Sequence, residues 1–193
     1  MPGMSTSALE LAVLRFDGEN TAVERYAQAR DAAPYRTDVE RPEWSRDVGF
    51  VERLHNGRLR LRGTFAGHYL DVDETDTVSQ RGAREGAATG GLLGVLGGPP
   101  GIAVGILVGM IAGGLAGAPD EVEWEPEALV AALRDLLPPS SSAIVMISSP
   151  AEVEELVRAL GDQAADVRRR ALSGEEAAAI EASLSAAPDA GAA

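Results

Sequence analysis

The sequence predicts an α+β fold: a ferredoxin-like split βαββαβ sandwich, an extra C-terminal helix-strand-helix, and a helical hairpin inserted into the domain. Two observations predict this architecture. Short apolar runs of strand length alternate with longer segments of helical periodicity, and 34 consecutive residues, Gly86 to Pro119, carry no charge. We expect residues 1–80 and 120–186 to form the α+β domain, residues 81–119 the glycine-zipper hairpin, and residues 187–193 a disordered tail.

The first elements are a strand and a helix. Leu11 to Phe16 is a short, mostly apolar run that ends in Asp17-Gly18, which is typical of a buried strand stopped by a turn. Asn20 suits the N-cap of a helix that continues through Ala32, and Pro34 closes this segment. The next residues are polar and are interpreted as a loop.

A β-hairpin is predicted around Asn56-Gly57, because this pair favours positive φ at both turn positions. Its strands are Val48 to Leu54 and Arg58 to Arg62. Leucine and arginine alternate in the second strand, so its three arginines share one face. A polar stretch, Thr64 to Glu85, then leads to the uncharged run.

The C-terminal part predicts three helices and two strands. Pro126 suits the first turn of a helix that ends before Pro138-Pro139, and the fully apolar run Ala143 to Ile147 predicts a central strand. Ser149 and Ser173 each begin a capping box, the first for a helix that ends at Gly161 and the second for one reaching about Ala186. Between them, Ala164 to Leu172 predicts an edge strand. A mixed or antiparallel sheet with helices on one face would bury these apolar stripes.

Glycine recurs every fourth residue in the uncharged run, on both sides of Pro99-Pro100. On a helix this spacing keeps glycine on nearly one face, where another backbone can approach closely. The proline pair predicts a bend between two helical arms. We therefore predict an association site in two ladders: Gly86, Gly90, Gly94 and Gly98 in the first, and Gly101, Gly105, Gly109, Gly113 and Gly117 in the second.

Composition excludes several classes of function. The formal net charge is −13, which disfavours nucleic acid as a partner. All 17 basic residues are arginine, and no cysteine is present, so a disulfide framework, a thiolate zinc site and a thiol nucleophile are excluded. Without lysine, the glycines at 97, 98 and 101 do not form a phosphate-binding loop. We predict no cofactor. The N-terminal residues show neither the basic region nor the apolar run of a secretory signal, which indicates the cytoplasm.

Several polar groups are candidate sites, each with a simpler structural interpretation. An acidic group resembles a hard-cation site but lacks the spacing of a calcium loop, so a solvated loop explains it better: His68, Asp71, Asp73, Glu74 and Asp76. Two arginine groups suit anionic headgroups or phosphate, or else an exposed strand face and a protected sheet edge: Arg58, Arg60 and Arg62, and Arg168 to Arg170. His55 is interpreted as a turn neighbour, and the serines at 140–142 and 148–149 as caps and turns. We predict no catalytic residue and no metal ligand.

The sequence resembles the family of bacterial proteins called domain of unknown function 1269, often labelled predicted membrane proteins. The resemblance extends over nearly the whole chain and lies in five segments: AVLRFDGENTAVERY, DVGFVERLHNGRLRLRG, GGLLGVLGGPPGIAVGILVGMIAGGLAG, SSSAIVMI and RRRALSGEEAAAI. None of them is a catalytic motif. The resemblance implies a membrane-linked or self-associating protein and supplies no activity. This chain departs from the family in lacking lysine and in its longer polar segment from Arg36 to Arg46.

The arms of the hairpin are short for a bilayer. Gly86 to Gly98 would extend about 20 Å as a helix and Gly101 to Gly117 about 26 Å, against roughly 30 Å of hydrocarbon. A re-entrant wedge with both flanks on the cytoplasmic side therefore fits better than a conventional span. In water, exposed Ile102, Ile106, Leu107 and Ile111 would form an apolar patch, so the hairpin would pack on its own domain or on copies of itself.

Three functions remain open from the sequence. The first is a non-enzymatic, membrane-associated protein whose hairpin inserts into or lies against the bilayer and mediates self-association, with the lipid bilayer and itself as partners. The second is a soluble homo-oligomeric assembly protein of the cytoplasm, with hairpins packed in a common core. The third is a small-molecule-binding ferredoxin-like module, because that fold hosts many binders.

Overall fold

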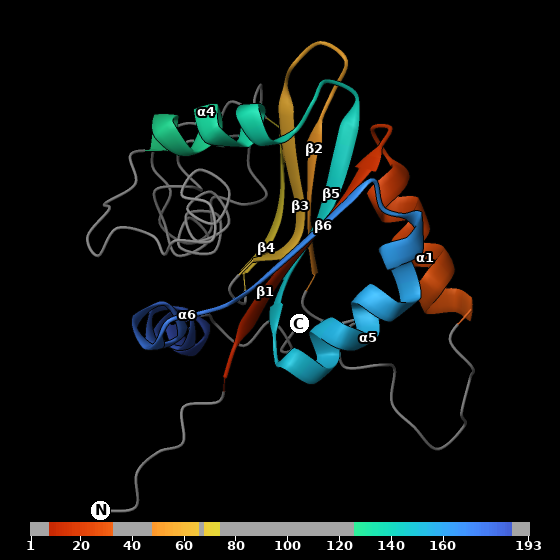
Figure 1. Ribbon diagram of the computed structural model, residues 1–193. Helices are drawn as coiled ribbons and strands as arrows, with labels where there is room; N and C mark the ends of the chain where they lie inside the picture. Colours follow the sequence, from red (N-terminus) through yellow and green to blue (C-terminus); the bar gives the residue numbers. More distant parts are fainter. Residues whose placement is uncertain (1–7, 33–47, 66–67, 74–125, 187–193) are drawn as a thin grey trace, which may run out of the picture.

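The computed structural model describes residues 8–32, 48–65, 68–73 and 126–186 (Figure 1). These residues form an α+β domain around one six-stranded sheet in the order β4-β3-β2-β5-β1-β6, with every neighbouring pair antiparallel. The strands are β1 (Glu10–Asp17), β2 (Val48–Arg53), β3 (Leu59–Phe65), β4 (His68–Asp73), β5 (Ser141–Ser148) and β6 (Asp166–Ala171). The helices are α1 (Thr21–Ala32), α4 (Pro126–Leu136), α5 (Pro150–Leu160), the short 3₁₀ turn η2 (Gly161–Gln163) and α6 (Gly174–Ala186).

Strand β5 lies in the middle of the sheet, as its apolar sequence predicts. It pairs with β1 on one side, where Val145 lies opposite Val13, and with β2 on the other, where Ala143 lies opposite Val51. Strand β6 pairs with β1 and forms one edge, which confirms the second strand prediction. Strands that precede residues 74–125 therefore pair directly with a strand that follows them.

Helices cover both faces of the sheet (Figure 1), so the expectation of helices on one face is wrong. The reason is that β1 is apolar on both sides. Leu11 and Val13 belong to the core beneath α4 and α6, whereas Leu14 and Phe16 belong to the core beneath α1 and α5. A strand that alternates between two apolar sets needs cover on each face.

The β2–β3 hairpin forms where the sequence predicts it, but with a different turn. Only Gly57 has positive φ, at 83°, and Asn56 does not. The Leu54 N–H donates to the Arg58 carbonyl, and the Gly57 N–H donates to the Leu54 carbonyl. A three-residue loop with glycine in the left-handed region replaces the two-residue turn, because Gly57 alone supplies the required backbone conformation.

Strand β4 was not expected, because its residues fall in the stretch interpreted as polar. It pairs with β3 in a register that places Asp73 opposite Arg60 and Asp71 opposite Arg62. Opposite charges across the pair allow this polar segment to join the sheet as an edge strand. Both predicted capping boxes are present: Ser149 with Glu152 at α5, and Ser173 with Glu176 at α6.

Candidate functional site

The predicted association site lies outside the described residues. All nine ladder glycines, together with Glu74, Asp76 and the tail, fall in ranges that the structure does not describe. What the structure does give is where the segment attaches: it leaves the sheet after Asp73, the last residue of β4, and rejoins at Pro126, the first residue of α4. None of the described helices is both long and apolar enough to cross a bilayer.

Arg53, on β2, holds α4 against the sheet, and sequence reasoning missed this role. Its Nη1 donates to the Leu137 carbonyl at 2.8 Å and also to the Arg134 carbonyl. Both carbonyls lie at the C-terminal end of α4, where a cation complements the helix dipole. The signal was available in the sequence: Arg53 has the same strand parity as buried Val51, so it points under a helix rather than into water.

The second polar group is an ion-pair ladder on β2, β3 and β4 and on Arg58, the residue before β3; its members are Glu52, Arg58, Arg60, Arg62, Asp71 and Asp73. Arg60 Nη2 lies 2.8 Å from Asp71 Oδ1, and Arg62 Nη2 lies 2.6 Å from Glu52 Oε1. Arg58 donates two hydrogen bonds to the Asp73 carboxylate, one from Nε and one from Nη2. The cation candidates Asp71 and Asp73 and the anion candidates on β3 therefore neutralise one another.

Glu52 is the most buried member of the ladder, with only 1% of its surface exposed. Burial raises the pKa of this carboxyl above its ordinary value, and the Arg62 guanidinium opposes the shift. Arg62 also donates to Asn20 Oδ1 at 3.4 Å, which ties the ladder to the start of α1. The ladder thus fixes the outer strands of the sheet to its helical layer.

Three connections meet at one end of the sheet around Glu19. Its carboxylate accepts hydrogen bonds from the backbone N–H of His55 and, at 3.4 Å, from the Ser140 hydroxyl. Glu19 Oε1 also lies 3.1 Å from His55 Nδ1. The His55 backbone N–H is the main cause that holds the pKa of Glu19 below its ordinary value. Ser140 has φ of 56°, in the left-handed region. A serine, a histidine and a carboxylate thus meet, but the carboxylate lies between the other two, whereas nucleophilic catalysis places the imidazole there. The group joins loops.

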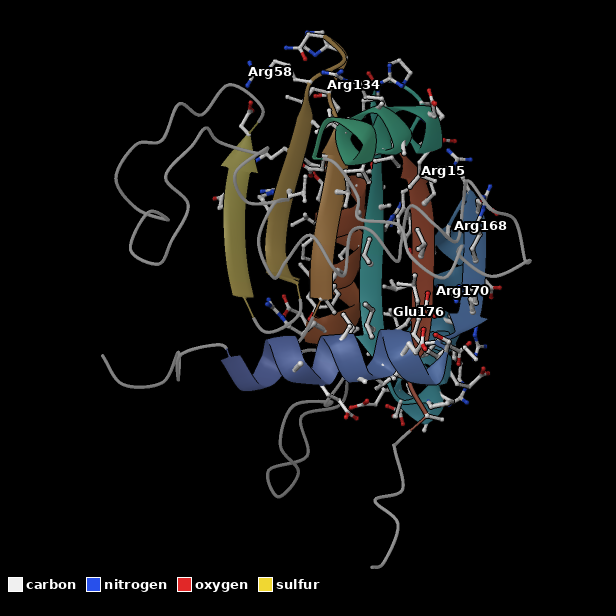
Figure 2. All side chains as sticks on the ribbon, turned by 90° about the vertical axis from the view of Figure 1, so that its left-hand side faces the viewer. Arg15, Arg58, Arg134, Arg168, Arg170 and Glu176 are labelled. Atoms are coloured by element: carbon white, nitrogen blue, oxygen red, sulfur yellow. The ribbon has the colours of Figure 1, made fainter. Side chains whose placement is uncertain are left out.

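The arginines of β6 fasten this edge strand to its surroundings, and Figure 2 shows Arg168 and Arg170 along that edge. Arg168 Nε lies 2.8 Å from Asp166, Arg169 bridges Glu10 and Glu154, and Arg170 forms a two-pronged pair with Glu176. The hydrogen bonds of Arg169 with Glu10 and Glu154 raise the pKa of its guanidinium, and the bond with Glu10 contributes more. The edge-strand interpretation accounts for these pairs.

The serine runs act as turn and cap residues, as predicted. Ser142 Oγ donates to the Gly18 carbonyl at 2.7 Å and accepts the Ala22 N–H at 3.0 Å, so it holds the β1–α1 connection. Ser149 caps α5. Among the residues that the structure describes, no group of three or more histidine, aspartate or glutamate side chains is placed to hold a metal ion.

Residues 83–185 match the family described as "Protein of unknown function (DUF1269)", which is just over half of the chain. The match includes the uncharged run, α4, β5, α5, β6 and nearly all of α6. It does not include β1 to β4, where two of the five segments that carry the resemblance lie. No curated protein and no solved structure matches the chain.

Proposed function

The chain belongs to the DUF1269 family, and from that premise we propose that it is a non-enzymatic, membrane-associated protein. The inserted glycine-zipper segment enters or lies against the bilayer and mediates self-association through its two ladders. The folded domain remains on the cytoplasmic side and presents this segment. Partners are the bilayer and further copies of the same chain.

One observation supports the proposal: the six strands in the described ranges pair in one continuous sheet, with strands from both sides of the inserted segment next to each other. Strand β5 follows the insertion, yet it pairs along its length with β1 and β2, which precede it. Because strands from the two halves of the domain pair with each other, we infer that the 52 residues between Asp73 and Pro126 have a role other than forming this sheet.

The attachment points support a presenting role. Asp73 is held in an ion pair with Arg58 directly before the insertion begins, and Arg53 holds the far end of α4 soon after it returns. Rigid attachment on both sides keeps the two ends of the insertion in fixed positions on the domain. An anchor that is fixed at its base transmits the orientation of the domain to whatever surface it binds.

We also propose that the core is a ferredoxin-like variant. The units β1-α1-β2 and β5-α5-β6 interleave, which produces the order β6-β1-β5-β2. On this interpretation, β3, β4, the insertion and α4 enter between the second and third strands of the core, and α6 is appended. This differs from the element order expected from sequence, in which the helix before β5 belonged to the βαββαβ unit.

Vesicle flotation of the full chain tests the function. The wild-type protein should rise with vesicles of phosphatidylethanolamine and phosphatidylglycerol, and Gly105→Leu with Gly109→Leu should lose oligomers, because bulk on the ladder prevents close helix contact. Gly97→Leu with Gly114→Leu is the matched control, since these glycines lie off the ladders. A chain that stays at the bottom of the gradient and is monomeric by light scattering would contradict the proposal; a detergent-free oligomer that ignores vesicles would favour the soluble assembly.

A further inference from the structure

The β2–β3 turn carries an asparagine followed by a glycine, so a side-chain amide lies next to a backbone nitrogen that no side chain shields. Asn56 is exposed, and Figure 1 shows the turn at the top of the view, where the chain passes from β2 to β3. Gly57 has φ of 83°, and a Cβ added there would meet no described atom within 4 Å, its chain neighbours aside. The turn therefore leaves open space around the bond between these two residues.

The side-chain amide of Asn56 is held by the backbone that follows it. Its Oδ1 accepts a hydrogen bond from the Arg58 N–H at 3.0 Å. When the Gly57 nitrogen attacks Asn56 Cγ, negative charge develops on this same oxygen. A backbone donor that already points at the oxygen stabilises that charge, so the hydrogen bond activates the amide toward attack.

A second hydrogen bond restrains the attacking nitrogen. The Gly57 N–H donates to the Leu54 carbonyl at 2.8 Å, so this bond must break before the nitrogen loses its proton. Glu19 favours the closed turn, because its carboxylate accepts the backbone N–H of His55, the residue before Asn56. Local opening of the turn therefore controls how often the nitrogen is free to react, and the Glu19 contact opposes that opening.

We propose that Asn56 is a site of spontaneous covalent modification in which water is the co-reactant and the Glu19 contact limits the rate. The Gly57 nitrogen, deprotonated by hydroxide, bonds to Asn56 Cγ, and the side-chain NH2 leaves with a proton from water as ammonia. The product is a five-membered succinimide ring. Water then adds to one of the two ring carbonyl carbons and breaks its bond to the Gly57 nitrogen, which regains a proton. Opening at Cγ gives aspartate, and opening at the main-chain carbonyl carbon gives isoaspartate.

The modification changes the turn in charge and in length. Both products replace a neutral amide by a carboxylate, which adds a negative charge one residue from the His55 N–H that Glu19 binds. Isoaspartate also lengthens the main chain by one methylene. Two residues further on, Arg58 holds Asp73 directly before the inserted segment. The inference goes beyond the proposed function, because it concerns the base of the insertion and requires neither a bilayer nor self-association.

Peptide mapping of the folded full chain by mass spectrometry tests the site, and the chain contains its own control. It has two asparagines, Asn20 and Asn56, and both are exposed. Asn20 is followed by β-branched Thr21, the first residue of α1. In mildly alkaline buffer, we expect Asn56 to be converted to aspartate and isoaspartate while Asn20 keeps its amide. The rate should rise about tenfold per pH unit, because only the deprotonated Gly57 nitrogen attacks and its population rises by that factor.

The variant Glu19→Ala tests what limits the rate. It removes the acceptor of the His55 N–H, so the turn should open more often and Asn56 should lose its amide about fivefold faster. Glu19→Gln keeps a neutral acceptor and should give a smaller increase. Glu24→Ala is the matched control, because it removes an exposed carboxylate of α1 and should leave the rate unchanged. Circular dichroism establishes that each variant is folded before its rate is compared.

Three results would overturn the proposal. Retention of the Asn56 amide in the folded chain, under conditions in which the urea-unfolded chain loses it, would mean that the turn protects the residue. Equal loss at Asn20 and Asn56 would mean that the turn has no part in the reaction. An unchanged rate in folded Glu19→Ala and Glu19→Gln would mean that the Glu19 contact does not limit it. Membrane binding and oligomer formation are measured separately, so each of these results leaves the proposed function standing.

Discussion

The two faces of the sheet are built from the same strands but by different means. Beneath α1 and α5, the described core consists of aliphatic and aromatic side chains from β1, β2, β5 and the two helices. Tyr26 of α1 packs edge-on against Phe50 of β2, with ring centroids 5.3 Å apart. Farther out on this face, β2, β3 and β4 carry the ion-pair ladder. Beneath α4 and α6, apolar side chains extend from β1 as far as β3, and the half-buried Arg53 donates to helix carbonyls.

This difference indicates what each face is for. The outer strands of the α1/α5 face carry paired charges, of which Glu52 is buried while Arg60 and Asp71 keep part of their surface in water. The α4/α6 face remains apolar across four strands and is the side on which the inserted segment rejoins the domain. Both faces are packed cores, and the α4/α6 face also carries α4, the helix that follows the insertion.

The largest expected effect comes from truncating one leucine on each face of β1. Leu11 and Leu14 are both 0% exposed and belong to opposite cores. Leu11→Ala and Leu14→Ala should each lower the free energy of unfolding by about 3 kcal/mol, because each leaves a cavity in a packed interior. Urea unfolding measures both. If Leu11→Ala cost less than about 1 kcal/mol while Leu14→Ala cost the full amount, the α4/α6 face would not be a packed core.

Removing the arginine that holds α4 should have the next largest effect. Arg53→Met should lower the free energy of unfolding by about 2 kcal/mol, because two helix carbonyls lose a charged donor. Arg15→Met is the matched control: Arg15 lies on β1 and pairs with Asp17, whose side chain is 84% exposed, so its loss should cost less than about 1 kcal/mol. Thermal unfolding compares them, and equal losses would mean that Arg53 does not anchor the helix.

Sequence reasoning predicted the elements better than the sides they occupy. The strand at 143–147, its central place, both capping boxes and the edge position of β6 followed from apolar runs and capping residues, which are local signals. The assignment of α4 to the opposite face from α5 did not follow. It depends on β5 pairing between β1 and β2, a contact between residues about 90 positions apart that no local pattern encodes.

The polar groups show the same limit. The alternation of Arg58, Arg60 and Arg62 was visible, but their partners were not, because Asp71 and Asp73 were interpreted as a solvated loop. Two short charged segments predict a strand pair only when they are considered together. Glu19, His55 and Ser140 come from three separate connections, so their meeting depends on the complete sheet.

Two carboxyls with opposite pKa shifts should give opposite responses to pH. Burial raises the pKa of Glu52, so the folded protein binds more protons than the unfolded chain between the ordinary and the raised value, and stability falls as pH rises through that window. The pKa of Glu19 is lowered, chiefly by the His55 backbone N–H, so its contribution is present above the ordinary value and is lost as pH falls through the lowered one.

Glu52→Gln should therefore reduce the loss of stability as pH rises from about 4.5, and Glu19→Gln should reduce the loss as pH falls below it. Urea unfolding at a series of pH values measures both variants against the wild type. The two variants change the slope of stability against pH on opposite sides of the ordinary carboxyl value. If both variants changed the slope of stability against pH on the same side of this value, the assignment of Glu52 as the desolvated carboxyl and Glu19 as the stabilised one would be wrong.

The smallest expected effect lies where connections from the two faces meet. Ser140 precedes β5 with φ of 56°, a conformation that costs an L-residue about 1 kcal/mol and glycine little. Its hydroxyl bond to Glu19 is long, at 3.4 Å, so Ser140→Gly should raise the free energy of unfolding by about 0.5 kcal/mol. Ser142→Ala is the contrast, because Ser142 Oγ both donates and accepts in a buried place and its loss should destabilise the protein. A destabilised Ser140→Gly variant would mean that the bond to Glu19, which joins the β1–α1 connection to the α4–β5 connection, outweighs the backbone strain.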